Sequence, residues 1–163
     1  MTITEFCDYH RACDEGRGWA VANCQTMQEA WDTARHNHLF WIATRPGVAS
    51  DADLRKFAVW SARQVQHLLT DQSSLNALDV AERHANGLAT DAELEDARAA
   101  AWTATRDNAS DAAYSATLNT ARTAARSAAW NAALACPVGA ARDAAWSAQD
   151  AWLRKNITPN FEL

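Results

Sequence analysis

The sequence predicts an all-α fold: a single-domain antiparallel helical bundle of about seven to nine helices, with alanine- and tryptophan-rich helices near its C-terminal end. Three observations indicate helices. Alanine, which has the highest helix propensity of all residues, dominates the last third of the chain. At several points along the sequence, a serine, threonine or aspartate occupies the expected N-cap position of a helix. No segment has the period-two alternation that is typical of a β-strand.

The first fifty residues contain short segments with helix start and stop signals. Thr2 with Glu5 and Thr26 with Glu29 have the spacing of capping boxes. Glycine and asparagine provide the further boundaries. The expected helices run from Thr2 to about Cys13 with Gly16 as the stop, from Arg17 to Cys24, from Thr26 to Ala34, and from a cap at Asn37 over His38 to Thr44.

Three longer amphipathic helices are expected next. They begin at Ser50 with Asp51, at Ser73 or Ser74, and at Thr90 with Glu93, which is a third capping box. Gly87 is expected to stop the second of them in the left-handed conformation. The apolar stripe of the first contains Leu54, Phe57, Ala58, Ser61, Val65, Leu68 and Leu69.

The last third repeats a short unit in which an arginine precedes a tryptophan by four residues. Residues four apart share one face of a helix, so we expect each arginine to lie across its tryptophan as a cation–π pair. The copies are Arg98–Ala104, Arg126–Ala132 and Arg142–Ala148, with a degenerate copy at Ser110–Ala116.

Two breaks are expected within this repeat, at Asp107–Ser110 and at Pro137–Gly139. The copies are not separated by whole helical turns, so one straight helix would scatter their aromatic side chains around its axis. Separate helices would instead bring Trp102, Trp130 and Trp146 into a common core. Trp19, Trp31, Trp41 and Trp60 also fall on apolar stripes and are assigned to the core.

Length and composition predict one domain over residues 1–163, large enough to bury a core without disulfides or metal. Its parts are mixed amphipathic helices in 1–88, repeat helices in 89–154 and an extended tail in 155–163. We expect Ile157 and Phe161 of the tail to dock on the body of the protein.

The net charge of −5 argues against nucleic-acid binding, which needs a basic face. An acidic surface suits a basic protein partner. The N-terminus lacks the basic and apolar regions of a signal peptide, and runs such as Leu39–Ala43 are too short to span a bilayer. We therefore expect a cytoplasmic protein without membrane contact.

The cysteines and histidines do not form a recognisable catalytic or metal motif. Cys7, His10 and Cys13 are spaced three apart, with Cys24 as a further candidate ligand, but the close cysteine pairs of a zinc site are missing. We expect these thiols and Cys136 to be reduced and buried. No metal and no cofactor is expected.

The histidines are explained in the same way. The pair His36 and His38 has no carboxylate beside it in sequence, and His67 and His84 are isolated on polar faces. Nucleophilic catalysis also needs an orienting group and an oxyanion site, which the sequence does not supply. We expect no catalytic residue and a protein that is not an enzyme.

Two acidic clusters and one tryptophan are the candidate partner-binding residues. They are Asp91, Glu93, Glu95 and Asp96, then Asp14 and Glu15, and finally Trp152, which is expected to be partly exposed. Two interpretations of the acidic clusters stay open. They are either the solvated first turns of helices, which the helix dipole favours, or patches that meet a basic partner.

Taken in order, these features resemble the immunity-protein family of bacterial polymorphic toxin systems, specifically its alanine- and tryptophan-rich all-helical group. The resemblance continues into the alanine-rich C-terminal helices. The matching segments are Ala12-Cys13-x-x-Gly16-x-x-Trp19, Glu29-Ala-Trp31, Leu39-Phe-Trp41-Ile-Ala43, Asp53-Leu-Arg-Lys-Phe-Ala58, Ala77-Leu-Asp-Val-Ala-Glu-Arg83 and Gly87-x-Ala-Thr-x-x-Glu-Leu94.

The resemblance implies a non-enzymatic inhibitor that binds a cognate toxin and blocks its active site. A nuclease toxin with a basic surface would suit the acidic chain, since complementary charge raises the association rate. The alternative is a phage-encoded anti-defence inhibitor, of the anti-CRISPR type, that binds a nucleic-acid-processing effector subunit. A homodimer is a further expectation that the sequence leaves open.

Overall fold

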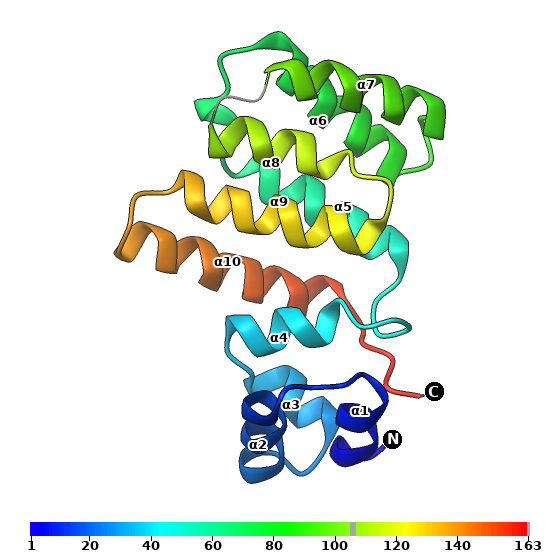
Figure 1. The fold of residues 1–163 in the computed structure, drawn as a ribbon, viewed down its shortest axis with the longest axis vertical. Helices are drawn as coiled ribbons and strands as arrows, with labels where there is room; N and C mark the ends of the chain where they lie inside the picture. The colour runs from blue at the N-terminus through cyan, green and yellow to red at the C-terminus, as the bar shows by residue number, and fades with distance from the viewer. Residues whose placement is uncertain (105–106, 163) are drawn as a thin grey trace. The chain divides into compact units, whose positions relative to one another are not determined.

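The computed structural model describes residues 1–104 and 107–162 and confirms the all-α prediction. These residues form ten α-helices and one short 3-10 helix, and no strand occurs among them (Figure 1). Residues 105, 106 and 163, which belong to the predicted repeat segment and tail, lie outside the described residues. The helices are α1 Ile3–Tyr9, α2 Asp14–Asn23, α3 Met27–Thr33, α4 His36–Ala43, α5 Asp51–Arg63, η1 Gln66–Leu68, α6 Gln72–Ala85, α7 Asp91–Ala104, α8 Asn108–Ala116, α9 Ala121–Ala135 and α10 Ala140–Asn156.

The number of described α-helices is ten, above the expected seven to nine, because a further break separates α8 from α9. The Thr117 hydroxyl donates to the Tyr114 carbonyl oxygen at 2.6 Å, and the chain turns there. Thr120 then caps α9, with its Oγ1 accepting from the backbone N–H of Thr123. Side chains of this type compete with helix propagation by bonding to the local backbone.

Two compact units contain the described helices. Unit 1 consists of Met1–Ala49 and the described residues from Asp150 onward, with α1 to α4 and the end of α10. Unit 2 consists of the described residues within Ser50–Gln149, with α5 to α9, η1 and the start of α10. The assignment of all residues to one domain stays a prediction.

Several predicted caps are confirmed. The capping boxes of Thr2 with Glu5 and of Thr90 with Glu93 are both present. Gly87 follows α6 with φ of +72°, a left-handed conformation that glycine adopts without the steric cost of a side chain. The remaining confirmed boundaries are Thr26 before α3, Ser50 before α5, Asp107 before α8, and Pro137–Gly139 before α10.

Other boundaries differ from the prediction. The first helix ends at Tyr9 because Arg11 takes a positive φ of +54°. Cys13 then caps α2, so Gly16 lies inside this helix and donates its N–H to the Cys13 sulfur. Helix α4 is capped by Arg35, where Asn37 was expected, and α6 is capped by Asp71, where Ser73 or Ser74 was expected. Helix α5 ends at Arg63, so Leu68 does not continue its apolar stripe and is exposed.

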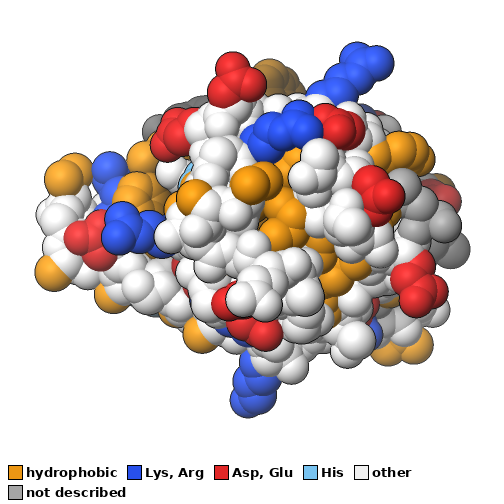
Figure 2. Space-filling model, turned by 90° about the horizontal axis from the view of Figure 1, so that it is seen from below, with side chains coloured by type: hydrophobic (Ala, Val, Ile, Leu, Met, Phe, Trp, Pro, Cys, Tyr) orange, Lys and Arg blue, Asp and Glu red, His pale blue; other side chains and the backbone are white. Residues whose placement is uncertain are grey.

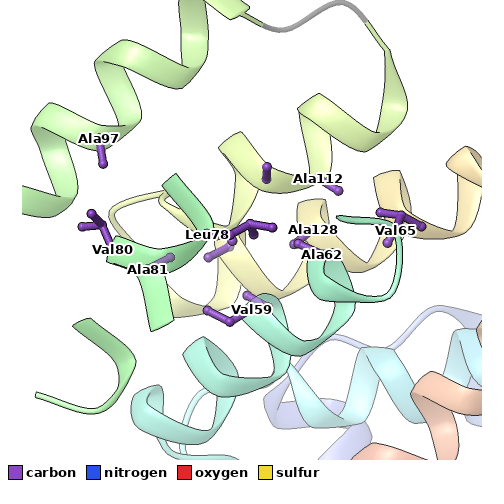
Figure 3. Packing of buried hydrophobic residues seen from close by; sticks show 14 of the residues in the cluster. Val59, Ala62, Val65, Leu78, Val80, Ala81, Ala97, Ala112 and Ala128 are labelled. Atoms are coloured by element: carbon purple, nitrogen blue, oxygen red, sulfur yellow. The ribbon is translucent and has the colours of Figure 1, made fainter. Parts of the chain in front are cut away.

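Alanine faces make up much of the core of unit 2 (Figure 3). Helix α9 packs against α5 and α8, and α6 packs against α7 and α8. Because alanine adds only a methyl group, helices that pack through it approach closely. The α9 residues buried at these contacts are Ala121, Ala124, Ala125, Ala128, Ala129, Ala132 and Ala133.

The assignment of the repeat tryptophans to the core is wrong for all three. Trp102 is 63% exposed, Trp130 is 55% exposed, and Trp146 is half-buried. Trp130 lies outside the buried alanine stripe of α9. A bulky indole within that stripe would hold the packed helices apart. Trp31, at 1% exposed, is a core residue as predicted. Trp19, Trp41 and Trp60 are half-buried, so their assignment to the core is wrong as well.

Two arginines of the repeat bind oxygen atoms. The Arg98 guanidinium donates to the Glu95 carboxylate, and Arg142 donates to the carbonyl oxygens of Leu134 and Cys136. In unit 1 the Arg45 guanidinium carbon lies 4.7 Å from the centre of a Trp41 ring, which is a cation–π contact outside the repeat.

The tail docks on unit 1, as predicted. Ile157 is buried, and the ring of Phe161 meets Phe6 edge-on with 5.9 Å between ring centroids. The backbone N–H of Asn160 donates to the Val48 carbonyl oxygen at 2.9 Å. None of the described helices combines the length and the apolar character that a bilayer-spanning segment needs.

Candidate functional site

An aromatic pair of one exposed and one half-buried side chain lies between α7 and α8 of unit 2. The rings of Trp102 and Tyr114 have centroids 5.2 Å apart, and Trp102 is mostly exposed. Arg98 Nε donates to Glu95 Oε2 at 2.9 Å. Hydrogen bonds to Glu95 and then to Tyr114 raise the pKa of Arg98, while the bond from Arg98 lowers the pKa of Glu95. We call Glu95, Arg98, Trp102 and Tyr114 the α7–α8 surface.

The predicted acidic cluster begins in the first turn of α7, and three of its carboxylates have partners within the chain. Asp91 lies 2.8 Å from His84 Nε2, Glu93 lies 3.0 Å from an Arg83 nitrogen, and Glu95 binds Arg98. The fourth, Asp96, is exposed and has no ion pair with a described residue. These pairs reduce the negative charge that the cluster offers to a partner.

The same pairs explain the local electrostatics. Hydrogen bonds from the backbone and hydroxyl of Thr90, followed by the bond from Arg83, lower the pKa of Glu93. The His84 side chain is only 14% exposed, so the prediction of an isolated histidine on a polar face is wrong. Part of the acidic cluster therefore stabilises the start of α7 and its contact with α6.

The other predicted binding residues belong to unit 1. Asp14 and Glu15 are exposed in the first turn of α2, and Trp152 is half-buried near the end of α10. The neighbouring carboxylate of Asp8 binds Arg17 at 2.5 Å. The predicted residues thus divide between the two units, with the cluster of residues 91–96 on α7 of unit 2.

An apolar pocket of about 230 Å³ is enclosed by α1 to α4 of unit 1. Figure 2 shows hydrophobic side chains exposed as a band on the face seen from below, with carboxylates around it. Sequence reasoning missed this pocket because it assigned Trp19 and Trp41 to the core. The main lining residues are Phe6, Cys7, Cys13, Glu15, Trp19, Met27, His38, Trp41 and Ile42.

The cysteines of the chain differ in exposure. Cys7 and Cys24 are buried as predicted, and burial raises the pKa of Cys7. Cys13 is exposed, with its sulfur at the N-cap of α2, and Cys136 is only partly buried, so the prediction of a buried thiol is wrong for both. Burial, followed by the charge of Arg45, lowers the pKa of His10.

Within residues 1–104 and 107–162, no three His, Cys, Asp or Glu side chains are grouped so that they could hold a metal ion. His36 has a carboxylate neighbour that the sequence did not indicate: its Nδ1 lies 2.7 Å from Asp150 Oδ1. This pair joins α4 to the end of α10 within unit 1.

Comparison of the chain with protein-family models, with curated proteins and with solved structures found no match.

Proposed function

We propose that this chain is a non-enzymatic protein-binding inhibitor, which neutralises a toxin by covering it in the manner of an immunity protein. The α7–α8 surface is the observation that carries the proposal. Tryptophan, tyrosine and arginine are the residue types most enriched among those that dominate protein–protein binding energy. Here all three lie together, and Trp102 is 63% exposed.

Charge supports a basic partner. The chain has a net charge of −5, and Asp96 on the same helix is exposed and has no ion pair with a described residue. Opposite charge on a partner would steer association and raise its rate, an effect that falls with added salt. Trp102, packed on the half-buried Tyr114, would supply the apolar anchor, and the acidic residues around it would form the polar rim.

The proposal is tested by co-expression with a basic toxin encoded beside this gene. We expect growth rescue and a stoichiometric complex by size-exclusion chromatography. Trp102→Ala should weaken the complex at least about 10-fold, which corresponds to roughly 1.4 kcal/mol at an interface anchor. Tyr9→Ala, which removes an aromatic side chain that is 62% exposed in unit 1, is the matched control.

Three outcomes would contradict the proposal. A complex that tolerates Trp102→Ala as well as Tyr9→Ala would exclude the α7–α8 surface. Capture of a nuclease subunit of a phage-defence system, without rescue from any toxin, would favour the anti-defence alternative. Self-association of the isolated chain through Trp102, measured by light scattering, would make the surface a homodimer contact.

A further inference from the structure

The pocket of unit 1 has the size of a single side chain. Its volume is about 230 Å³, below the roughly 300–1,000 Å³ of pockets that bind drug-sized ligands or cofactors. Four short helices supply its walls. The indole of Trp19 packs against His38, with 4.9 Å between ring centroids, and Met27 and Ile42 add aliphatic surface. Such walls suit an unbranched apolar chain, such as the methylene part of a long side chain.

The pocket also carries one carboxylate. Glu15 is exposed in the first turn of α2, contributes to the lining, and has no ion pair with any residue that the structure describes. No lysine or arginine contributes to the lining. Two nearby arginines already have partners within the chain: Arg17 binds Asp8, and Arg45 lies over the pocket residue Trp41 and donates to its carbonyl oxygen. The pocket is therefore complementary to a positive charge.

We propose that this pocket receives one basic side chain, a lysine or arginine, of the protein partner. Lysine and arginine bury their methylene stems against apolar surface while the charged head stays near water. The stem would pack on Trp19 and Met27, and the head group would bind Glu15. The proposal rests on the proposed function, because the partner supplies the side chain.

Blocked amino acids test the pocket without the partner. The probes are the Nα-acetyl methylamides of lysine and arginine, with norleucine as the uncharged stem and glutamate as the opposite charge. Binding is followed by ¹⁹F NMR of protein carrying 5-fluorotryptophan, with the Trp19 signal identified by Trp19→Phe. We expect lysine and arginine to shift this signal saturably, and norleucine to bind at least about fivefold more weakly.

Two variants and a control make the test specific. Glu15→Gln should weaken lysine binding at least about fivefold, and Ala20→Leu should abolish it by filling the pocket. Asp32→Asn changes a carboxylate of α3 that does not line the pocket and should leave binding unchanged. Because Glu15 is exposed, Glu15→Gln should fold even if Ala20→Leu does not. Equal binding of lysine and norleucine, or no effect of Glu15→Gln, overturns the proposal.

The toxin complex separates this proposal from the proposed function. A complex that is weakened by Trp102→Ala and unaffected by Glu15→Gln leaves the function standing and overturns the pocket's role. Weakening by both variants supports both proposals. If the lysine probe binds but no protein forms a complex with the chain, a protein as the source of the side chain is overturned and free alkylamines remain as ligands.

Discussion

Replacing Trp130 by alanine should destabilise unit 2 only modestly. A large aromatic residue in a closed core costs about 3–5 kcal/mol when truncated to alanine. Trp130 is 55% exposed, so less than half of its surface is buried on folding. Trp130→Ala should therefore lower the free energy of unfolding by about 2 kcal/mol at most. The cost should be smaller still, because an open site leaves no closed cavity behind. Phe57 in the same unit is 0% exposed, and Phe57→Ala should cost the full 3–5 kcal/mol.

Urea unfolding followed by circular dichroism at 222 nm measures both variants against the parent chain. Both positions belong to unit 2, so the comparison does not require the two units to unfold together. Trp130→Ala should move the transition midpoint less than half as far as Phe57→Ala, with an unchanged slope. An equal shift for the two variants would mean that the indole is buried between helices, and it would refute the alanine-packing argument.

Three further predictions concern local features. The pKa of Glu93 lies below its ordinary value of 4.5. Its carboxylate therefore stabilises the fold above that pH, and the contribution is lost as the pH falls through the lowered pKa. Helicity is followed by circular dichroism as the pH is lowered, and Glu93→Gln should reduce the loss of helicity at acid pH. An unchanged acid-induced loss would contradict the stabilising role of the Glu93 carboxylate. Cys13 should react with a thiol reagent in the folded protein, whereas Cys7 and Cys24 should react only after unfolding. Protection of Cys13 would contradict its exposed position. Gly87→Ala should cost about 1 kcal/mol in thermal unfolding because of the positive φ, and an unchanged midpoint would show that the turn relaxes.

Helix starts could be predicted well from the sequence because caps are local. Thr2, Ser50, Thr90 and Asp107 all act through a backbone N–H three residues further along. The start of α2 could not be predicted in this way, because Cys13 is not among the residues that usually cap helices. A sulfur acceptor at 3.4 Å from the Gly16 nitrogen takes the role there.

The tryptophans were misassigned because the repeat was interpreted as a core motif. The correct signal was present in the spacing of the alanines. In α9 the buried positions recur in adjacent pairs every four residues, as in Ala124 and Ala125 followed by Ala128 and Ala129. Trp130 comes directly after such a pair and is therefore rotated about the helix axis by about 100° from Ala129 and about 200° from Ala128.

The functional surfaces were harder to predict because they depend on contacts between distant segments. His36 and Asp150 are 114 positions apart in sequence, and no local pattern connects them. The pocket likewise needs four helices to enclose it. The sequence supplied Glu15 as a candidate through its charge alone, and it gave no indication that Trp19 lines the same pocket.

In unit 2, alanines occupy buried positions and Trp102 and Trp130 occupy exposed ones, and this contrast bears on function. Alanine on α9 already closes the contacts with α5 and α8, so these helices do not need an indole to fill the space between them. Trp102 is 63% exposed, and it contributes less to folding than a buried aromatic side chain would. Its place beside Tyr114 and close to Arg98 is therefore poorly explained by stability. Under the proposed function, the indole would instead be buried at the interface with the protein partner.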